Sequence, residues 1–318
     1  MDFNFLSDLY LDIQLNADLS EHTTFKLGGP AKAVITAQTP YQLEHTITRL
    51  AEKNIDFILI GGGSNLLISD KGLKCVVVRY AGLPFVERDG NDLVVAASTM
   101  LDSLAQFALA QSLEGLNYTS GIPGTVGGAI VGNAGAFGKQ VGDVLHSVLL
   151  IDKNGKKHEE RASDLGFKYR HSNLKERGDI ILGARFRLTP ANQEALVKER
   201  DEILSIRREK HPDLRRLPCA GSFFRNIEPT SAAGKRQAAG WFLEEAGAKK
   251  MSVGGASVFE KHANIIVKSN GCLAQDVYDL SNQMAQAVYD KFNLALVREV
   301  RLVGQFQKMP ESVKTTIW

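Results

Sequence analysis

A glycine-rich segment in the middle of the chain constrains the fold more than any other part of the sequence. Between residues 121 and 128, four of eight positions are glycine: Gly121, Gly124, Gly127 and Gly128. Ordering them costs conformational entropy, because glycine loses more backbone freedom on folding than any other residue. Close contacts that a Cβ would prevent must compensate that cost. Two kinds of contact remain open: a flat ligand or its phosphates, and a buried turn packed tightly against a neighbouring strand.

A second glycine-rich loop, Gly61-Gly62-Gly63-Ser64-Asn65, follows directly on the apolar run 57–60. Its backbone N–H groups could approach a pyrophosphate closely. The loop is not a G-x-G-x-x-G fingerprint, because Leu66 occupies the sixth position, and it is not a P-loop, because no Gly-Lys-Ser/Thr follows. A simple tight turn is the alternative interpretation.

Length and composition predict a globular chain with more than one domain. The 318 residues exceed the size at which a single hydrophobic core usually stops growing, and the content of 44% hydrophobic and 23% charged residues is close to average. A net charge of +2, with basic residues scattered along the chain, does not favour nucleic acid as a partner. No segment approaches the roughly 18 consecutive apolar residues of a membrane span.

The cysteines and the N-terminus predict a cytoplasmic protein. Cys75, Cys219 and Cys272 are far apart, which fits neither a disulfide framework nor the paired spacing of a zinc site. The seven histidines form no pattern of metal ligands, so we expect no metal. Residues 1–11 lack the basic and long apolar regions of a secretory signal.

Hydrophobic periodicity predicts a mixed α/β chain, of the α+β class. The first elements form a β-α-β unit, with strands at 31–37 and 57–60 around a helix at 41–53 that begins after Thr39-Pro40. Further strands are predicted at 75–79, 93–97, 148–151, 180–188, 264–267 and 296–303. Further helices are predicted at 101–112, 191–209, 240–246 and 273–292.

Three polar side chains outside the glycine loops are candidates for chemistry. Arg170 could pair bidentately with a carboxylate. Ser222 lies between a glycine and two phenylalanines, but without a G-x-S-x-G elbow or an adjacent histidine a hydrolase is disfavoured. Glu299 and Arg298 must point to opposite faces of the last strand, and periodicity does not decide which is buried. A structural or surface role is the alternative for each.

A local basic cluster follows the predicted helix 191–209. It indicates either a solvated helix end or a site for a phosphorylated small molecule. Its members are Arg207, Arg208, Lys210, Arg215 and Arg216.

Eight segments, taken together and in this order, resemble the UDP-N-acetylenolpyruvoylglucosamine reductase family. This family belongs to the superfamily of FAD-dependent oxidoreductases that includes vanillyl-alcohol oxidase. The resemblance covers about residues 15–306. The segments are 22–29, 61–67, 120–128, 169–170, 220–226, 239–241, 261–264 and 298–301.

The resemblance implies a two-subdomain FAD-binding module of the vanillyl-alcohol-oxidase type, followed by a C-terminal α+β substrate-binding domain. We place the two FAD-binding subdomains at 1–80 and 81–195, the substrate-binding domain at 196–306 and a C-terminal tail at 307–318. Some family members carry an inserted loop with a tyrosine that covers the substrate. Here the passage 229–240 is too short for it, so the chain resembles the shorter subclass.

The implied reaction is the NADPH-dependent, FAD-mediated reduction of UDP-N-acetylglucosamine enolpyruvate to UDP-N-acetylmuramate, a step of peptidoglycan precursor synthesis. Reduced flavin N5 would give a hydride to the terminal enolpyruvyl carbon, and Ser222 would protonate the adjacent carbon. Arg170 would bind the substrate carboxylate, and Glu299 would supply an active-site carboxylate. We expect no obligatory protein partner.

The resemblance also implies the binding residues. Those expected to bind FAD are Gly61, Gly62, Gly63, Ser64, Asn65, Leu66, Ser120, Gly121, Ile122, Pro123, Gly124, Thr125, Gly127, Gly128, Asn133, Gly135 and Ala136. Those expected to bind the substrate are Tyr169, Arg207, Lys210, Asn226 and Asn264, with Lys210 a candidate for the UDP diphosphate.

Two alternatives stay open at this point. One is a different flavin enzyme of the same superfamily, an oxidase that acts on an alcohol or a sugar. Many of those attach FAD through a histidine near the first glycine loop, and residues 61–67 contain none. The other is a non-catalytic nucleotide-binding protein, which would be expected to have lost Arg170, Ser222 or Glu299.

Overall fold

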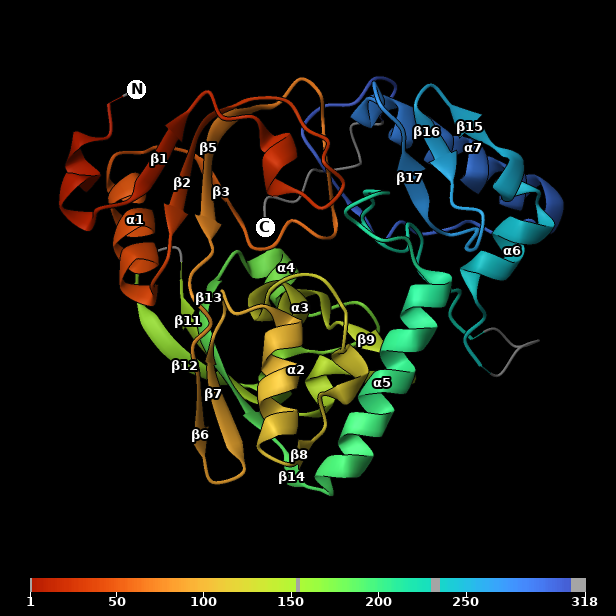
Figure 1. Cartoon of the computed structure of the whole chain (residues 1–318). Coiled ribbons are helices and arrows are strands. Elements are labelled where there is room, and N and C mark those ends of the chain that lie inside the picture. The colour runs from red at the N-terminus through yellow and green to blue at the C-terminus, as the bar shows by residue number, and fades with distance from the viewer. Residues whose placement is uncertain (1, 153–154, 230–234, 310–318) are drawn as a thin grey trace.

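The computed structural model describes residues 2–152, 155–229 and 235–309 (Figure 1). Within these ranges the chain is mixed α/β, as predicted, and forms two larger sheets and a smaller C-terminal α+β unit. Most of the predicted tail, residues 310–318, and residues 230–234 of the passage 229–240 lie outside the described residues. The domain boundaries at residues 80, 195 and 306 stay a prediction.

The first sheet contains the predicted β-α-β unit. Its strand order is β1-β2-β5-β3, with β2 and β3 parallel to β5 and β1 antiparallel to β2. The connecting helix begins where expected, because Thr39 accepts a hydrogen bond from the Gln42 N–H and Pro40 occupies the first turn. These elements are β1 (Asp12–Leu15), β2 (Ala31–Ala37), α1 (Pro40–Glu52), β3 (Phe57–Ile60) and β5 (Leu73–Tyr80).

The second sheet is antiparallel throughout, with strand order β12-β11-β13-β7-β6. Helices α2 and α3 lie between this sheet and the long helix α5 (Figure 1). The elements are β6 (Val86–Asp89), β7 (Asp92–Ala96), α2 (Leu101–Ala110), α3 (Val126–Gly132), β11 (Leu145–Ile151), β12 (Lys157–Arg161), β13 (Ile180–Arg187) and α5 (Gln193–Lys210).

Short elements complete this half of the chain. Its other strands are β4 (Leu66–Ile68), β8 (Leu113–Glu114), β9 (Gly135–Ala136), β10 (Lys139–Gln140) and β14 (Thr189–Pro190), and its one-turn helix is α4 (Leu174–Arg177). Turns of 3-10 helix lie at Asn4–Leu9, Leu19–His22, Asn117–Thr119, Val141–Asp143 and Ala162–Leu165.

One continuous apolar core joins the two larger sheets. Val78 and Tyr80 from the first sheet belong to the same buried cluster as Leu104 of α2 and Phe186 of the second sheet. Because each sheet buries one face in this shared core, the loops at the ends of β3 and before α3 are held at fixed positions relative to each other.

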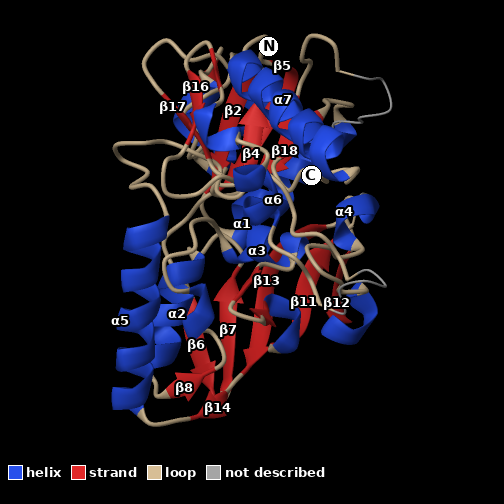
Figure 2. Cartoon of the chain, turned by 90° about the vertical axis from the view of Figure 1, so that its right-hand side faces the viewer, coloured by secondary structure: helices blue, strands red, loops and turns tan. Residues whose placement is uncertain are grey.

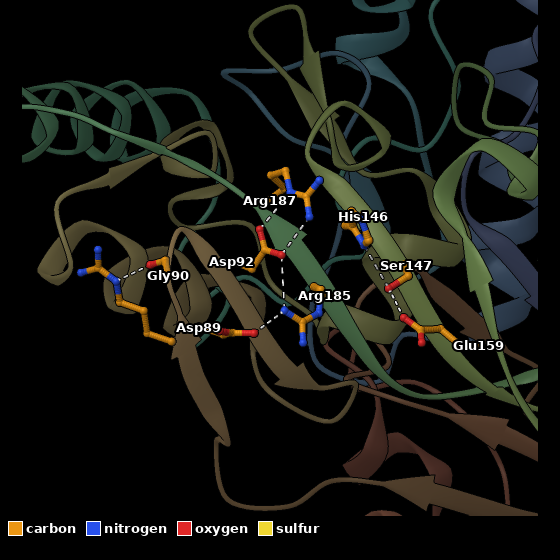
Figure 3. Close-up of polar contacts among 9 residues, drawn as sticks. Asp89, Gly90, Asp92, His146, Ser147, Glu159, Arg185 and Arg187 are labelled. Carbon is orange, nitrogen blue, oxygen red and sulfur yellow. Dashed lines mark hydrogen bonds and ion pairs between the residues drawn. The ribbon is translucent and has the colours of Figure 1, made fainter.

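A ladder of polar pairs crosses strands of the second sheet (Figure 3). Asp92 on β7 accepts hydrogen bonds from Arg187 at 3.0 Å and Arg185 at 3.3 Å, both on β13. The hydrogen bond from Arg187 lowers the pKa of the Asp92 carboxyl. Ser147 on β11 donates to Glu159 on β12. Since these groups satisfy one another across neighbouring strands, the cluster stabilises the sheet and is not a second reactive site.

The C-terminal unit has its own core and sits beyond the upper end of α5 (Figures 1 and 2). The buried side chains include Phe223, Phe242, Tyr278 and Met284. The elements are α6 (Ala239–Glu245), a 3-10 turn at Ala248–Lys250, β15 (Ser252–Val253), β16 (Ala256–Val258), β17 (Ile266–Lys268), α7 (Ala274–Phe292) and β18 (Arg301–Val303). In the part of the chain that the structure describes, no helix is long and apolar enough to cross a membrane.

The predicted closing strand 296–303 is wrong in its first half. Only Arg301–Val303 forms a strand, β18, which pairs in parallel with β4 (Leu66–Ile68). Since β4 has only three residues, the ladder cannot extend further, and residue 298 makes a single bridge to Phe224 instead. The pairing returns the end of the chain to the strand that follows the first glycine loop.

A carboxylate of the first half caps the longest helix of the C-terminal unit. Asp70, two residues after β4, accepts hydrogen bonds from the backbone N–H groups of Ala274 at 2.8 Å and Gln275 at 3.0 Å. Both belong to the first turn of α7, where a negative charge is favourable. Asp70 therefore ties α7 to the first half of the chain.

Replacement of Asp70 by Ala is expected to lower the free energy of unfolding by about 1–2 kcal/mol, because two N–H groups at the start of α7 lose their acceptor. Asp70→Asn keeps an oxygen acceptor without the charge, so its loss should be smaller. Urea unfolding of the three proteins measures the difference. Equal stability of all three would contradict this role of Asp70.

Candidate active site

A cavity of about 1200 Å³ lies where the two larger sheets, α5 and the C-terminal unit meet. Both glycine loops line it, together with Arg170, Ser222 and Glu299. The three candidate catalytic side chains come from segments more than 50 residues apart, and the fold brings them to one cavity. Figure 2 shows how the two larger sheets, α5 and the C-terminal unit are arranged.

The two glycine loops pack directly on each other. A Cβ on Gly62 would lie 2.9 Å from the Cα of Gly124, and one on Gly61 would lie 2.3 Å from Thr125 Oγ1. Gly124 has φ +117°, and a Cβ there would lie 2.5 Å from Ser64 Oγ. At these positions the requirement for glycine comes from contact between the two loops, which was not anticipated from the sequence.

Two adjacent glycines of α3 meet different surroundings. A Cβ on Gly127 would lie 3.1 Å from the Cβ of Ala97, a contact so close that Ala97 would have to shift. A Cβ on Gly128 would meet only Thr125 Oγ1, at an ordinary contact distance of 3.6 Å, and Gly128 lines the cavity. Protein packing therefore does not explain Gly128, and its missing side chain leaves room in the cavity.

Arg170 occupies a tight turn that the preceding and following residues close. Lys168 and His171 exchange two backbone hydrogen bonds of 3.1 Å, and Arg170 between them has φ +55°. The left-handed region costs a non-glycine residue about 1 kcal/mol or more, so the surroundings must hold it there. Strain of this kind is concentrated at functional sites.

The side chain of Arg170 is fixed at two points. Its Nη1 donates to the Gly135 carbonyl at 2.8 Å. Its Nε lies 2.8 Å from Oε1 of Glu299, as an ion pair without the alignment of a hydrogen bond. The guanidinium therefore joins the second glycine-rich region, through Gly135, to the carboxylate from the end of the chain.

Backbone pairing brings Ser222 beside Glu299. Residue 222 bridges to Ile265, while the Glu299 N–H donates to the Phe223 carbonyl at 2.8 Å. Phe223 is 1% exposed and anchors the segment in the C-terminal core. Asn65 Nδ2 donates to the Glu299 carbonyl at 3.0 Å, so the first glycine loop also holds this segment.

Glu299 and Arg298 point in opposite directions, as the alternation requires. Arg298 Nε reaches Ser281 Oγ on α7 at 3.3 Å, and its guanidinium lies 5.5 Å from the centre of the Tyr278 ring. Burial lowers the pKa of Arg298. Arg298 therefore lies on the side of the core and Glu299 faces the cavity, a choice that the periodicity of the sequence left open.

The predicted substrate residues take different positions. Both amide atoms of Asn264 bind the backbone of Phe224, at 2.9 and 2.8 Å, although the residue lines the cavity. Asn226 also lines the cavity, and its Oδ1 accepts from the Ala239 N–H at 3.1 Å. The Tyr169 hydroxyl accepts from the Asn226 N–H at 3.2 Å, so Tyr169 supports Asn226 from behind the lining.

Arg207 and Lys210 are the members of the basic cluster that line the cavity. Arg207 lies 5.9 Å from the centre of the Phe137 ring, and burial lowers the pKa of its guanidinium. Arg215, by contrast, is exposed and pairs with Asp213 at 3.2 Å. The cluster is therefore divided between a cavity-facing part and a solvated part.

Three predicted cofactor residues lie outside the cavity lining. Ser120 accepts a hydrogen bond from Arg200 at 2.8 Å, and the Gly121 N–H donates to Asp102 at 2.8 Å. Asn133 ends α3 with φ +44°, and its side chain binds neighbouring loops. All three shape the loops that line the cavity. The other predicted cofactor residues line it: Gly61, Gly62, Gly63, Ser64, Asn65, Leu66, Ile122, Pro123, Gly124, Thr125, Gly127, Gly128, Gly135 and Ala136.

Sequence reasoning missed three cations of the cavity, Lys175, Lys261 and Arg301. Lys175 lies on the one-turn helix after the Arg170 turn, too short for a periodic signal, and Arg301 was quoted only within a motif. Burial, followed by the charges of Arg225 and Arg301, lowers the pKa of Lys175 to about 8. Among the described residues, no group of three or more His, Cys, Asp or Glu side chains could hold a metal ion.

Comparisons with known proteins agree on one family. Residues 31–159 match the family model described as an FAD binding domain, and residues 212–303 match that of the UDP-N-acetylenolpyruvoylglucosamine reductase C-terminal domain. The reductase of Carboxydothermus hydrogenoformans is 39% identical over 91% of this chain and 93% of its own length. That of Caldanaerobacter subterraneus subsp. tengcongensis is 36% identical over 92% of this chain and 94% of its own length.

A solved structure extends the agreement to the fold. The crystal structure of the UDP-N-acetylenolpyruvylglucosamine reductase from Thermus caldophilus has a TM-score of 0.75 and 30% sequence identity, and covers 92% of this chain and 99% of its own. Sequence relatives and fold match over nearly the whole chain, and the two family models match residues 31–159 and 212–303 within it. The chain therefore belongs to the UDP-N-acetylenolpyruvoylglucosamine reductase family of FAD-dependent oxidoreductases.

Proposed function

We propose that this chain reduces UDP-N-acetylglucosamine enolpyruvate to UDP-N-acetylmuramate, with NADPH as the reductant and FAD as the cofactor, in peptidoglycan precursor synthesis. One observation carries the proposal: both glycine loops, Arg170, Ser222 and Glu299 line a single cavity. The names of the relatives in the preceding section support the same reaction. We further propose that the enzyme acts in the cytoplasm, in keeping with its three free cysteines.

The cavity fits FAD in size and lining. Its volume of about 1200 Å³ exceeds that of a typical small-ligand site, and leaves room for a substrate beside a dinucleotide. Gly128 exposes its backbone to the cavity, and no contact with the protein explains why this position is glycine. When bound, FAD would supply hydride transfer from NADPH to the enolpyruvyl group. We propose that the lining residues of the two glycine loops hold it.

Arg170 would bind the substrate carboxylate and stabilise the negative charge that develops on it during reduction. Its guanidinium is already fixed by Gly135 and Glu299, so little reorganisation is needed when charge develops. Glu299 would orient Arg170 and contribute a carboxylate beside the reacting carbons. Such fixed donors contribute about 3–4 kcal/mol of transition-state stabilisation in comparable sites.

Ser222 would donate the proton to the carbon next to the carboxylate. A hydroxyl can do this only if the resulting alkoxide is stabilised, and the cation of Arg170 lines the same cavity. Arg207 and Lys210 on α5 would bind the diphosphate of the substrate, because they are the cavity-facing cations of the basic cluster. Asn226, Asn264 and Tyr169 would shape the remaining substrate wall.

Mass spectrometry of the product tests the reaction. The purified enzyme, with NADPH and the enolpyruvyl nucleotide, should convert the substrate into a species heavier by two hydrogens. With 4-deuterated NADPH, deuterium that reaches the terminal carbon would identify the hydride acceptor. Consumption of NADPH without a change in the nucleotide would reject the substrate assignment.

Gly127→Ala and Gly128→Ala form a matched pair that tests the cofactor site. Gly128→Ala should weaken FAD binding about tenfold or more, or about 1.4 kcal/mol, because a Cβ would enter the cavity. It should leave the apoprotein as stable or more stable by about 0.5–1 kcal/mol, since alanine is the better helix former. Gly127→Ala should instead lose stability, because its Cβ would press on Ala97.

The measurements are flavin fluorescence titration and thermal unfolding of the apoproteins. A Gly128→Ala protein that binds FAD as tightly as the wild type would contradict the placement of the cofactor against α3. Equal losses of stability in both variants would show that Gly128 serves packing after all.

Ser222→Ala separates the two half-reactions. Flavin reduction by NADPH should stay within about twofold of wild type, and flavin reoxidation by the enolpyruvyl nucleotide should slow by about 10²–10⁴-fold, the usual contribution of a positioned proton donor. Anaerobic stopped-flow absorbance measures both rates. Equal loss in the two half-reactions would remove Ser222 from the protonation step.

A further inference from the structure

Lys175 is a cavity cation to which the proposed reaction gives no direct role. Its Nζ donates a hydrogen bond of 2.7 Å to the backbone carbonyl of Arg170. This carbonyl belongs to the residue that the turn forces to φ +55°. A charged donor on a backbone carbonyl makes a strong hydrogen bond, so this contact is suited to hold the turn in its strained conformation.

The helix that carries Lys175 is itself anchored. Leu174 is fully buried in the core that the two larger sheets share, and Ser172 Oγ donates to the Val131 carbonyl at the end of α3 at 2.8 Å. The position from which Lys175 reaches Arg170 is therefore set by the second sheet and α3. The same α3 lines the cavity through Gly128.

The charges around Lys175 do not make its ammonium group a source of stability for the folded protein. Burial is the largest cause that lowers the pKa of Lys175; the charges of Arg225 and Arg301 lower it further, and those of Glu299 and Glu176 raise it. A half-buried ammonium among cations costs free energy relative to an apolar side chain of the same shape. A residue kept at such a cost is a candidate for a role in function.

We propose that Lys175 is a positioning residue that holds the Arg170 turn through its backbone carbonyl, and so sets the Arg170–Glu299 pair in the cavity. The inference rests on the proposed function and adds a residue to it. Lys175 acts through Arg170, and the proposal gives it no contact with the reacting atoms.

The proposal predicts a specific loss in Lys175→Met, which keeps the length of the side chain and removes the donor. Reoxidation of reduced flavin by the enolpyruvyl nucleotide should slow by about 10- to 100-fold, as expected for an ångström-scale displacement of a catalytic group. Flavin reduction by NADPH should stay within about twofold of wild type. Lys168→Met, an exposed lysine in the same turn, is the matched control and should leave both rates unchanged.

A double-mutant cycle with Arg170→Ala distinguishes positioning from direct contact. If Lys175 acts through Arg170, then Lys175→Met should slow reoxidation by less than about twofold in the Arg170→Ala background, because the residue it holds is gone. Fully additive losses would show that Lys175 contacts the substrate by itself and would overturn the proposal. So would a normal reoxidation rate in Lys175→Met.

The pH profile and the unfolding temperature separate this role from a merely structural one. Lys175 has a pKa of about 8, so it carries its proton below that pH and loses it above. The wild-type reoxidation rate should fall as pH rises through about 8. Lys175→Arg, which stays charged, should reoxidise its flavin faster than Lys175→Met, and its rate should not fall in this pH range. The groups that face Lys175 and tune this limb are Arg225, Arg301, Glu299 and Glu176.

Lys175→Met removes a half-buried charge but also the hydrogen bond to the Arg170 carbonyl, so its unfolding temperature should stay close to that of wild type. A lower unfolding temperature together with equal losses in both half-reactions would reduce Lys175 to a structural residue. If wild-type reduced flavin is not reoxidised by the nucleotide, the proposed function itself fails. If the wild type turns over normally and Lys175→Met reoxidises its flavin at the same rate, only the inference about Lys175 is overturned.

Discussion

The contact between Gly62 and Gly124 is the constraint on which the rest of the cavity depends. No side chain fits between these loops, because even a Cβ would come within 2.9 Å of the opposite backbone. The first loop follows β3 of the first sheet. The second loop leads into α3, which packs on the second sheet. Their contact fixes one edge of the shared core, and it leaves bare backbone facing the space where a dinucleotide can bind.

The end of the chain completes the site by returning to this edge. β18 pairs with β4, the strand directly after the first glycine loop, and Asn65 holds the Glu299 carbonyl. Glu299 then reaches across to Arg170, whose guanidinium is held by Gly135. Each candidate catalytic side chain is therefore held by segments from other parts of the chain. Displacement of β18, for example, would also displace Glu299 relative to Arg170.

Local signals in the sequence were sufficient for most of the fold. The Thr39-Pro40 start predicted α1, and the spacing of Leu280, Met284 and their neighbours predicted α7, because capping and helical periodicity depend only on nearby residues. The length of the last strand was missed, since it is set by its partner β4. The choice between ligand contact and tight packing for the glycines also required the structure, which assigns Gly62 to packing and leaves Gly128 facing the cavity.

We propose that a single cavity holds both a flavin and the enolpyruvyl substrate that reoxidises it. Anaerobic absorbance of the purified protein tests this claim most directly, with NADPH added first and the enolpyruvyl nucleotide second. The flavin band should bleach with NADPH and recover with the nucleotide. A band that bleaches and does not recover would contradict the substrate assignment, and a protein that cannot be reconstituted with FAD would contradict the claim as a whole.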